Sequence, residues 1–372
     1  MIRKRLLVRD AYLSCFGGMP MAMPVMSVDL ELGPDLHRLI EEIQRSGIYG
    51  NHGPQAMKME SEYANLLGVP ASRIVSASNA TLALQGAMAV MRLESWVIPS
   101  WTFAATAHAA AAIGAGVAFG DVDAESWMLA PSQVSAGEGA VVTAPFGSRI
   151  SIGEEWNHVA GLVVDAAAAI GAFPEISQHF ERPWAAVISL HATKVLGIGE
   201  GGFGVFSSDS LAQRFRQWTN FGFLGSRSAD FLGSNAKLSE LSAAVAICRI
   251  ARWPAEKTAW IEARRVVHEV GEELGVNPSF SYPDWVAPYW LARFNTHAEK
   301  NSAVAALGSA QIETRDWWSQ GCHRMPAFAR LKRKSSLPVT EALASTTLGL
   351  PFFRTLTRQQ AEEVRDVILQ QQ

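Results

Sequence analysis

Cysteine is scarce in this sequence. The three cysteines, Cys15, Cys248 and Cys322, are widely spaced and form no CxxC pair. A disulfide scaffold or a cysteine-based metal site needs more cysteines at closer, paired spacing. We therefore expect no metal site, and a reducing compartment, the cytoplasm, as the location of the protein.

Net charge and long apolar runs are also limited. Lys and Arg number 32 against 35 Asp and Glu, so the formal net charge is −3 and no basic field for nucleic acid is expected. The longest weakly polar stretch, 104–120, is mostly Ala and Gly, contains His108, and is too short for a membrane span. The basic and apolar start of the chain is interrupted by Arg9 and Asp10, so we expect no secretory signal.

Hydrophobic residues, by contrast, make up 48% of the chain, enough to fill a large core. Short apolar runs alternate with helical patterns, which predicts an α/β fold with a mainly parallel sheet. The predicted strands are 73–76, 96–99, 116–119, 140–144, 161–164, 185–189 and 202–207, and the predicted helices include 35–46, 55–67, 78–91, 211–219 and one that begins at 235–240.

A second, smaller domain is predicted near the C-terminus. A long helix, 254–275, would bridge to strands near 290–294 and 311–317 and to helices at 298–307 and 357–369. The predicted division is a large domain, 1–250, with an irregular N-terminal arm over 1–30, and a small α/β domain, 251–372.

Lys194 stands in a tight connection between two of the apolar strands, 185–189 and 202–207. A lysine amine held among apolar groups can form a Schiff base with an aldehyde. The alternative is a surface lysine at a strand end, and position alone does not decide between them.

Two further positions carry possible chemistry. Asp165 ends the strand 161–164, and the carboxyl ends of strands are where open α/β sheets place function, although the residue could also cap a helix. The helix that starts at Ser78, Asn79, Ala80 and Thr81 could bind a phosphate with its free backbone amides, or could be an ordinary capped helix.

Two motif matches are weaker. Asp121 and Asp123 form a DxD that could bind a metal–nucleotide, as in glycosyltransferases, although a solvated strand end is the favoured interpretation. Residues 197–202 match GxGxxG, but a strand follows them where a dinucleotide fingerprint needs a helix, so we reject that match.

The motifs taken together, in their order along the chain, resemble the DegT/StrS aminotransferases from about residue 17 to the C-terminus. These are fold-type-I enzymes that use pyridoxal phosphate (PLP) to aminate nucleotide-linked keto-sugars. The matching stretches are GP at 53–54 with Glu60, SNATLAL at 78–84, PSWTF at 99–103, VDAA at 164–167, SLHATK at 189–194, EGG at 200–202 and GSNAK at 233–237.

The resemblance implies a role for each matching residue. Lys194 would hold PLP covalently, and Asp165 would pair with the pyridine nitrogen and keep it protonated. Phe103 would stack on the ring. The remaining roles concern the phosphate, which would be bound by the amides of Ala80 and Thr81, the hydroxyls of Thr81 and Ser189, and Asn235 of a neighbouring subunit. The expected partner is therefore a second copy of the chain, in a homodimer with shared active sites.

The expected reaction moves an amino group from an amino acid, L-glutamate, to a nucleotide-linked sugar for surface polysaccharide or secondary-metabolite glycosylation. The stretches NFGF at 220–223 and RMPAF at 324–328 look most like the branch that aminates C4 of 4-keto-6-deoxy sugars, and amination at C3 is the alternative. His52, Arg315 and His323 are candidate substrate contacts by position only.

One departure from the family pattern bears on function. Ala168 stands where Gln or His is usual near the cofactor or sugar. This motivates a second hypothesis, a catalytically impaired family member with a regulatory or structural role. A PLP-dependent sugar dehydratase is disfavoured because histidine replaces the lysine in relatives of that type.

Overall fold

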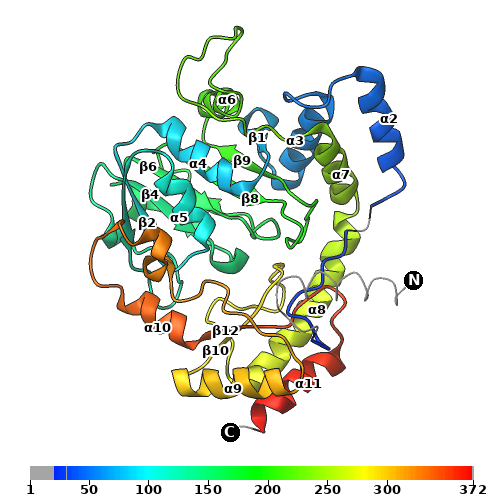
Figure 1. Ribbon diagram of the computed structural model, residues 1–372, viewed down its shortest axis with the longest axis vertical. Helices are drawn as coiled ribbons and strands as arrows, with labels where there is room; N and C mark the ends of the chain where they lie inside the picture. Colours follow the sequence, from blue (N-terminus) through cyan, green and yellow to red (C-terminus); the bar gives the residue numbers. More distant parts are fainter. Residues whose placement is uncertain (1–20, 31, 371–372) are drawn as a thin grey trace.

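The computed structural model describes residues 21–30 and 32–370, and most of the predicted arm lies outside them. A sheet-containing region occupies one end of the molecule, and a smaller region lies at the other, joined to it along one side by the long helix α8, Trp253–Leu274 (Figure 1). Elements α2, Leu36–Ser46, and α3, Pro54–Leu67, precede the first strand of the sheet.

Within the described residues the central sheet has eight strands in the order β1-β9-β8-β6-β4-β2-β3-β11. Strand β9 runs antiparallel to both of its neighbours, and the other pairs are parallel, so the prediction of a mostly parallel sheet is confirmed. The strands are β1, Ile74–Ala77; β2, Ser95–Pro99; β3, Gly116–Gly120; β4, Gly139–Thr143; β6, Gly161–Asp165; β8, Trp184–Ser189; β9, Gly202–Phe206; and β11, Lys332–Arg333.

Helices cover both faces of the sheet, which explains why its strands read as continuous apolar runs. In β6, Leu162 and Val164 pack into one buried cluster while Val163, which points the other way, packs into another. The first cluster contains residues of α2, α3, α7 (Glu240–Ala251) and α8, and the second contains residues of α4 (Ala80–Met91), α5 (Ala104–Ala111) and α6 (Asp209–Trp218).

The smaller region is built on two antiparallel strands, β10, Trp290–Arg293, and β12, Thr347–Leu350. Helices α9, His297–Ser309, and α11, Arg358–Leu369, pack there beside α8, and α10, Pro338–Thr346, leads into β12. The predicted strand near 311–317 is wrong: Ile312 and Arg315 make only single bridges, to Met23 and Gly349, and the strand that pairs with β10 is β12.

Two other expectations are corrected. The helix predicted to begin at 235–240 begins at Glu240, where the Ser239 side chain caps it, so Asn235 lies in the preceding loop. Part of the region predicted as the small domain returns to the large sheet, because β11 pairs in parallel with β3.

A third buried cluster joins the two regions. Its aromatic members include Trp101, Trp127 and Phe146 from loops of the large region, and Trp285 and Tyr289 from the chain before β10. The part of the chain that the structure describes has no helix long and apolar enough to span a bilayer.

Candidate active site

Strand register brings the predicted site residues to one edge of the sheet. Ser189 at the end of β8 pairs with Gly202, which pairs on its other side with Ala77 at the end of β1. Asp165, the last residue of β6, lies opposite Val187 of β8. The carboxyl ends of the parallel strands therefore gather the start of α4, Ser189, Asp165 and the turn that follows β8.

The N-terminus of α4 offers free backbone amides. The Asn79 side chain accepts from the amide of Leu82 at 2.9 Å, while the amides of Ala80 and Thr81 have no acceptor within the helix because they belong to its first turn. A Cβ at Gly202 would lie 2.8 Å from the Ala80 nitrogen, so only glycine allows β9 to start this close to the helix. Free amides and the helix dipole together favour a phosphate here.

Ser189 can add a hydroxyl donor to the same place. Its Oγ accepts from the amide of His191 at 3.2 Å, which leaves the hydroxyl hydrogen free to donate to an anion. The side chain is nearly buried, at 7% exposed, and the strand pairing with Gly202 fixes it beside the start of α4.

Asp165 is buried and held by two donors. The Thr106 hydroxyl donates to Oδ2 at 2.5 Å, and the Ala167 amide donates to Oδ1 at 3.2 Å. Burial raises the pKa of the Asp165 carboxyl, against the opposing effects of these two hydrogen bonds and of the nearby Lys194 charge. Because burial disfavours the charged carboxylate, a cationic partner such as a protonated ring nitrogen would stabilise its ionised form.

Lys194 lies in a turn, where its amide donates to the carbonyl of His191 at 2.8 Å and its carbonyl accepts from Gly197 at 2.9 Å. Its Nζ donates to the hydroxyl of Tyr289 at 2.6 Å. The side chain is half-buried and also lines a small cavity of about 30 Å³ with residues 26–30, Arg249 and others.

Phe103 stands at the same edge and is unusually open for an aromatic residue, at 59% exposed. It precedes α5, and its neighbour Thr102 shares a hydrogen bond of 2.9 Å with Thr106, the residue that donates to Asp165. An aromatic ring this exposed is available to stack on a flat ligand.

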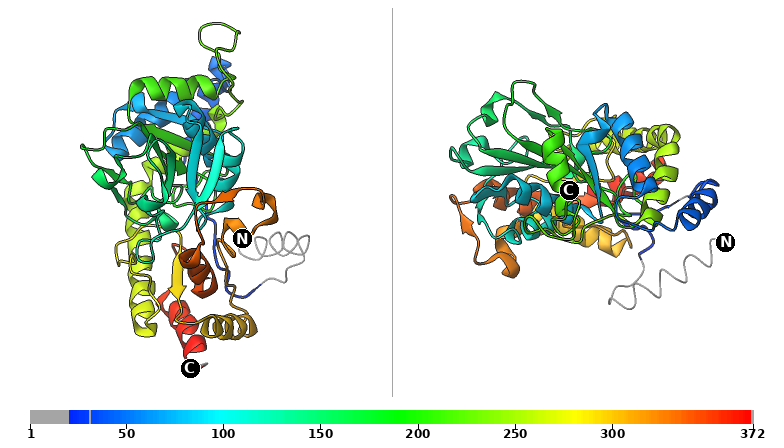
Figure 2. Two further views of the ribbon diagram at one scale, coloured as in Figure 1. Left: turned by 90° about the vertical axis from the view of Figure 1, so that its left-hand side faces the viewer. Right: turned by 90° about the horizontal axis from the view of Figure 1, so that it is seen from above.

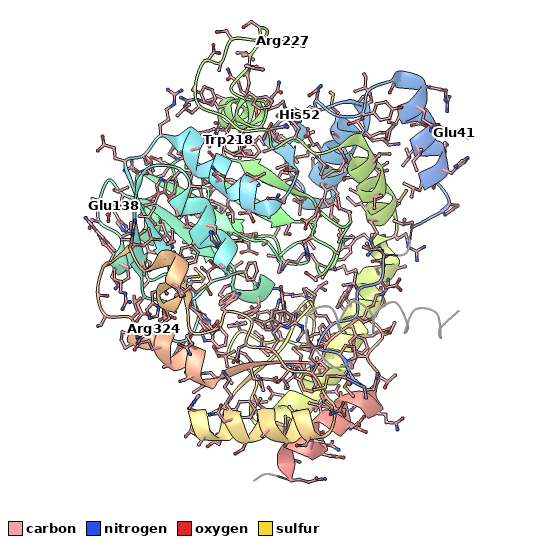
Figure 3. The ribbon with its side chains drawn as sticks, in the orientation of Figure 1. Glu41, His52, Glu138, Trp218, Arg227 and Arg324 are labelled. Atoms are coloured by element: carbon pink, nitrogen blue, oxygen red, sulfur yellow. The ribbon has the colours of Figure 1, made fainter. Side chains whose placement is uncertain are left out.

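The Asn235 side chain makes no described hydrogen bond to this group, although the carbonyl of the next residue, Ala236, accepts from the amide of Ser78 at 2.8 Å. Asn235 lies exposed at the end of the loop that follows α6, paired with Asn220, and its Oδ1 accepts from Lys237 at 2.8 Å. The loop projects well away from the body of the molecule (Figures 1 and 2), and Arg227 lies on its outer part (Figure 3).

The three predicted substrate residues are not brought together. His52 lies on the same side of the molecule as Arg227 (Figure 3), with Nε2 2.9 Å from the Thr219 hydroxyl and Nδ1 3.1 Å from Arg216. His323 has a fully buried side chain, and its Nδ1 is 2.7 Å from the Ser100 hydroxyl, so this arrangement gives it no access to a ligand.

Among the described residues, Arg315 is linked to Lys194 only through two aromatic residues, Trp317 and Tyr289. Its guanidinium lies over the ring of Trp317 at 5.1 Å, and that ring meets Tyr289 edge-on at 5.1 Å. The side chain is 47% exposed and donates to Glu313 at 2.6 Å.

The two aspartates of the DxD have structural partners. Asp121 is buried and accepts from the amides of Val339 and Thr340, both at 2.9 Å, at the start of α10. Asp123 accepts from the Ser126 amide and hydroxyl in a local turn. The described part of the chain holds no cluster of acidic, histidine or cysteine side chains suited to a metal ion.

The sequence did not point to Thr106 or Tyr289. Thr106 lies in the alanine-rich helix α5, and its hydroxyl is 2.9 Å from that of Thr102, which precedes the helix. Tyr289 has no comparable pattern, because it is 95 residues from Lys194 in the chain.

The residues at this edge fit PLP: an amine for its aldehyde, a buried carboxylate for its ring nitrogen, and free amides and a hydroxyl for its phosphate. The fold and these residues define a PLP-dependent aminotransferase of fold type I. The chain belongs to the DegT/DnrJ/EryC1/StrS aminotransferase family, which matches residues 31–369.

The chain is similar to several individual proteins. Protein Rv3402c of Mycobacterium tuberculosis is 29% identical over 83% of this chain and 80% of its own length. The dTDP-4-amino-4,6-dideoxy-D-glucose transaminase of Shigella dysenteriae is 26% identical over 57% of this chain and 60% of its own. The crystal structure of DesI, determined in the presence of its TDP-sugar product, is 27% identical, has a TM-score of 0.76, and covers 96% of this chain and 95% of its own.

Proposed function

We propose that this protein transfers an amino group from L-glutamate to C4 of a nucleotide-linked 4-keto-6-deoxy sugar. The observation that carries the proposal is the placement of Lys194 and Asp165 at one sheet edge, with Asp165 buried and hydrogen-bonded to Thr106. The family assignment, the dTDP-sugar transaminase and the TDP-sugar product of DesI support a nucleotide-sugar acceptor.

In this proposal each residue at the edge has a binding role. Lys194 would hold PLP covalently, Asp165 would pair with its ring nitrogen, and Phe103 would cover the ring. The amides of Ala80 and Thr81, with the hydroxyls of Thr81 and Ser189, would hold the phosphate. When bound, PLP supplies an electron sink that stabilises negative charge on the carbon next to the amino group.

The amine of Lys194 would then act as the proton carrier. Once the amine of the donor had displaced it from PLP, Lys194 would as a free base take a proton from the donor carbon, and as an ammonium would give that proton back. Asp165, if ionised beside the ring nitrogen, would favour the protonated form of that nitrogen. The same residues serve the second half of the reaction, in which the keto-sugar receives the amine.

The active site would be shared in a homodimer. The loop between α6 and α7 projects from the body, and Leu232 within it is 94% exposed while Phe221 is 45% exposed. Apolar side chains this open on a projecting loop suit contact with a second copy of the chain. Such contact would deliver Asn235 to the phosphate of the neighbouring subunit.

The substrate side of the site departs from the polar pattern of the family. Ala168 is 7% exposed and packs in the cluster of Trp101, Phe146 and Tyr289. A Cβ at Gly147 would lie 2.3 Å from the Ala168 carbonyl oxygen, so the turn after β4 fits tightly over this residue. Arg315, beside Trp317, is the proposed contact to the sugar or its diphosphate.

The test is a product assay with a covalent control. Purified protein is incubated with PLP, L-glutamate and either a dTDP-linked 4-keto-6-deoxyhexose or its 3-keto counterpart. The sugar-nucleotide products are identified by mass spectrometry. We expect amination of the 4-keto sugar, and borohydride should fix PLP on Lys194.

Three outcomes would count against parts of the proposal. Amination of only the 3-keto sugar would move the reaction to C3. Absence of any product despite PLP fixed on Lys194 would favour the regulatory role suggested by Ala168. Covalent labelling of another lysine by PLP, in wild-type protein or in Lys194→Ala, would remove Lys194 from the mechanism. The matched control is Lys58→Ala, which removes a lysine from the exposed surface of α3.

A further inference from the structure

Tyr289 reaches Lys194 from the far end of the chain. The Tyr289 hydroxyl accepts from Nζ at 2.6 Å, and the amine also lies 5.2 Å from the centre of the tyrosine ring. Tyr289 is 8% exposed and immediately precedes β10, so it belongs to the smaller region whereas Lys194 follows β8 of the central sheet. The hydrogen bond therefore spans the boundary between the two regions.

The main chain that carries Tyr289 is held by one buried arginine. Arg264 of α8 donates from Nε to the carbonyl of Trp285 at 3.1 Å, and from Nη2 to the carbonyls of Ala287, at 3.1 Å, and Tyr289. Its guanidinium is packed between the rings of Trp285 and Phe352, at 4.5 and 4.4 Å. Burial lowers the pKa of Arg264 to about 9.

Arg264 has a positioning role rather than an electrostatic one. It is 1% exposed, and among the described residues no carboxylate forms an ion pair with it. Its donors go instead to three carbonyls of a single five-residue segment, 285–289. A planar guanidinium offers fixed donor directions, so these bonds define the path of the segment as well as satisfying its carbonyls.

Aromatic neighbours fix the direction of the tyrosine ring. Phe146 meets it edge-on at 5.3 Å, and Trp317 meets it edge-on at 5.1 Å. Phe146 is itself stacked on Trp318 at 3.9 Å. A ring held from two sides, on a main chain held by Arg264, keeps its hydroxyl directed at the lysine amine.

We propose that Tyr289 is the positioning residue of Lys194: its phenol holds the lysine amine in place whenever that amine is free to react. The proposal rests on the proposed function of Lys194 as the residue that binds PLP and carries the proton. A phenol suits both protonation states of the amine, since its oxygen accepts from the ammonium and its hydrogen donates to the free base. The phenol keeps its own proton in both states.

The experiment compares Tyr289→Phe with Tyr282→Phe, which removes the same hydroxyl from a tyrosine seven positions earlier that faces Arg149 instead of Lys194. The first measurement is the rate at which PLP forms its covalent link to Lys194 in cofactor-free protein. Samples are quenched with borohydride at intervals, and the labelled peptide is identified by its mass. We expect this rate to fall about 10- to 100-fold in Tyr289→Phe, the range for loss of one hydrogen bond to a charged group, and to be unchanged in Tyr282→Phe.

The second measurement is the pH profile of turnover. In Tyr289→Phe we expect kcat to fall with little change in KM, and the profile of kcat against pH to shift. The proposal would be overturned if the PLP-labelling rate and the pH profile of Tyr289→Phe coincided with those of wild type. It would also be overturned if Tyr289→Phe and Tyr282→Phe lost activity equally, which would indicate a general loss of stability. Thermal unfolding of both variants identifies that case.

The two proposals fail in different ways. A wild-type protein that fixes PLP on Lys194 but aminates no sugar contradicts the proposed reaction, while the fixation rates still decide the role of Tyr289. A wild-type protein that fixes no PLP on Lys194 contradicts both.

Discussion

The Thr106 hydroxyl donates to Oδ2 of Asp165 at 2.5 Å, across the interval between α5 and the end of β6. Thr106 is itself fully buried and is also bonded to Thr102 at 2.9 Å. Since Oδ1 of Asp165 accepts from Ala167, both carboxylate oxygens have a donor before any ligand is considered. The carboxylate is therefore fixed in orientation by the protein alone.

Removing this hydrogen bond should alter the pH dependence of turnover. Thr106 lowers the pKa of Asp165, so Thr106→Val, which keeps the shape, should raise that pKa further and move the acid limb of the kcat profile to higher pH. We also expect kcat at neutral pH to fall about tenfold, as for loss of one hydrogen bond to a charged group. Thr106→Ser restores the hydroxyl and should resemble wild type; profiles of Thr106→Val and wild type that coincide would contradict the assignment.

Asp165 should also make the cofactor-free protein sensitive to pH. Its pKa is raised in the folded state, so the unfolded chain loses this proton at lower pH, and the folded state loses stability as pH rises through the raised pKa. Asp165→Asn cannot ionise and should show a smaller decline in denaturation midpoint over that range. The same variant should bind PLP yet turn over far more slowly, because an amide cannot keep the ring nitrogen protonated. An unchanged kcat would exclude Asp165 from the mechanism.

Mixing two inactive variants tests the shared active site. Lys194→Ala and Asn235→Ala should each be poor alone. In mixed dimers one site carries both lesions and the other carries neither, so activity should return toward roughly a quarter of wild type if chains exchange at random and sites act independently. Subunit exchange confirmed by mass with no recovery of activity would show that Asn235 serves its own chain.

Asn235→Ala should further make PLP binding depend on protein concentration, because a ligand held by two chains favours the dimer. Ser228→Ala, at an exposed polar position on the same loop, provides the comparison for a change in the loop that leaves Asn235 in place. Titration of PLP at several protein concentrations measures both variants.

His52 should destabilise the protein as pH falls. Burial, with the Arg216 charge, lowers the pKa of His52 to about 4 from an ordinary value of 6.5. The unfolded chain therefore takes up a proton first, and stability present above pH 6.5 is lost toward pH 4, by at most about 3 kcal/mol. His52→Asn should flatten unfolding free energy over this range, whereas His37→Asn on the surface should not; equal slopes for His52→Asn and wild type would refute the prediction.

The neutral form of His52 follows from its partners. The Thr219 hydroxyl donates to the Arg216 carbonyl at 2.7 Å, so its oxygen accepts from Nε2 of His52. Nδ1 then accepts from Arg216 at 3.1 Å. A proton on Nδ1 would face this guanidinium, which the nearby Glu60 holds through a hydrogen bond of 2.6 Å.

Much of the fold was predictable because both faces of the sheet are covered. Buried strands such as β6 and β8 are short apolar runs, and Asp165 and Lys194 stand where those runs stop, so their positions are visible in the sequence. The strand β12 was missed because TLGL directly follows helix α10 without a turn residue between them. In the false strand near 311–317, the apolar side chain of Trp317 serves ring packing against Tyr289 instead of strand pairing.

The second layer of the site was not predictable for a different reason. Thr106 and Tyr289 act through single hydrogen bonds that form only after distant elements pack, and one hydroxyl leaves no pattern in a sequence. His323 illustrates the converse error: this polar residue directly precedes a family-like stretch, but its ring nitrogen forms a buried hydrogen bond with Ser100.

The short strand β11 has a consequence for how the protein can be divided. It covers the outer side of β3, with Lys332 beside Ala118 and Arg333 beside Phe119, and the Lys334 amide extends the contact to the Phe119 carbonyl at 2.8 Å. A fragment that stopped before residue 322 would lack β11 and leave the edge of β3 unpaired. An unpaired edge strand can pair with strands of other molecules. Lys332 and Arg333 of β11, with Lys334 directly after it, place three cationic residues along this edge, so the edge of the large region is covered by residues far beyond its own last helix.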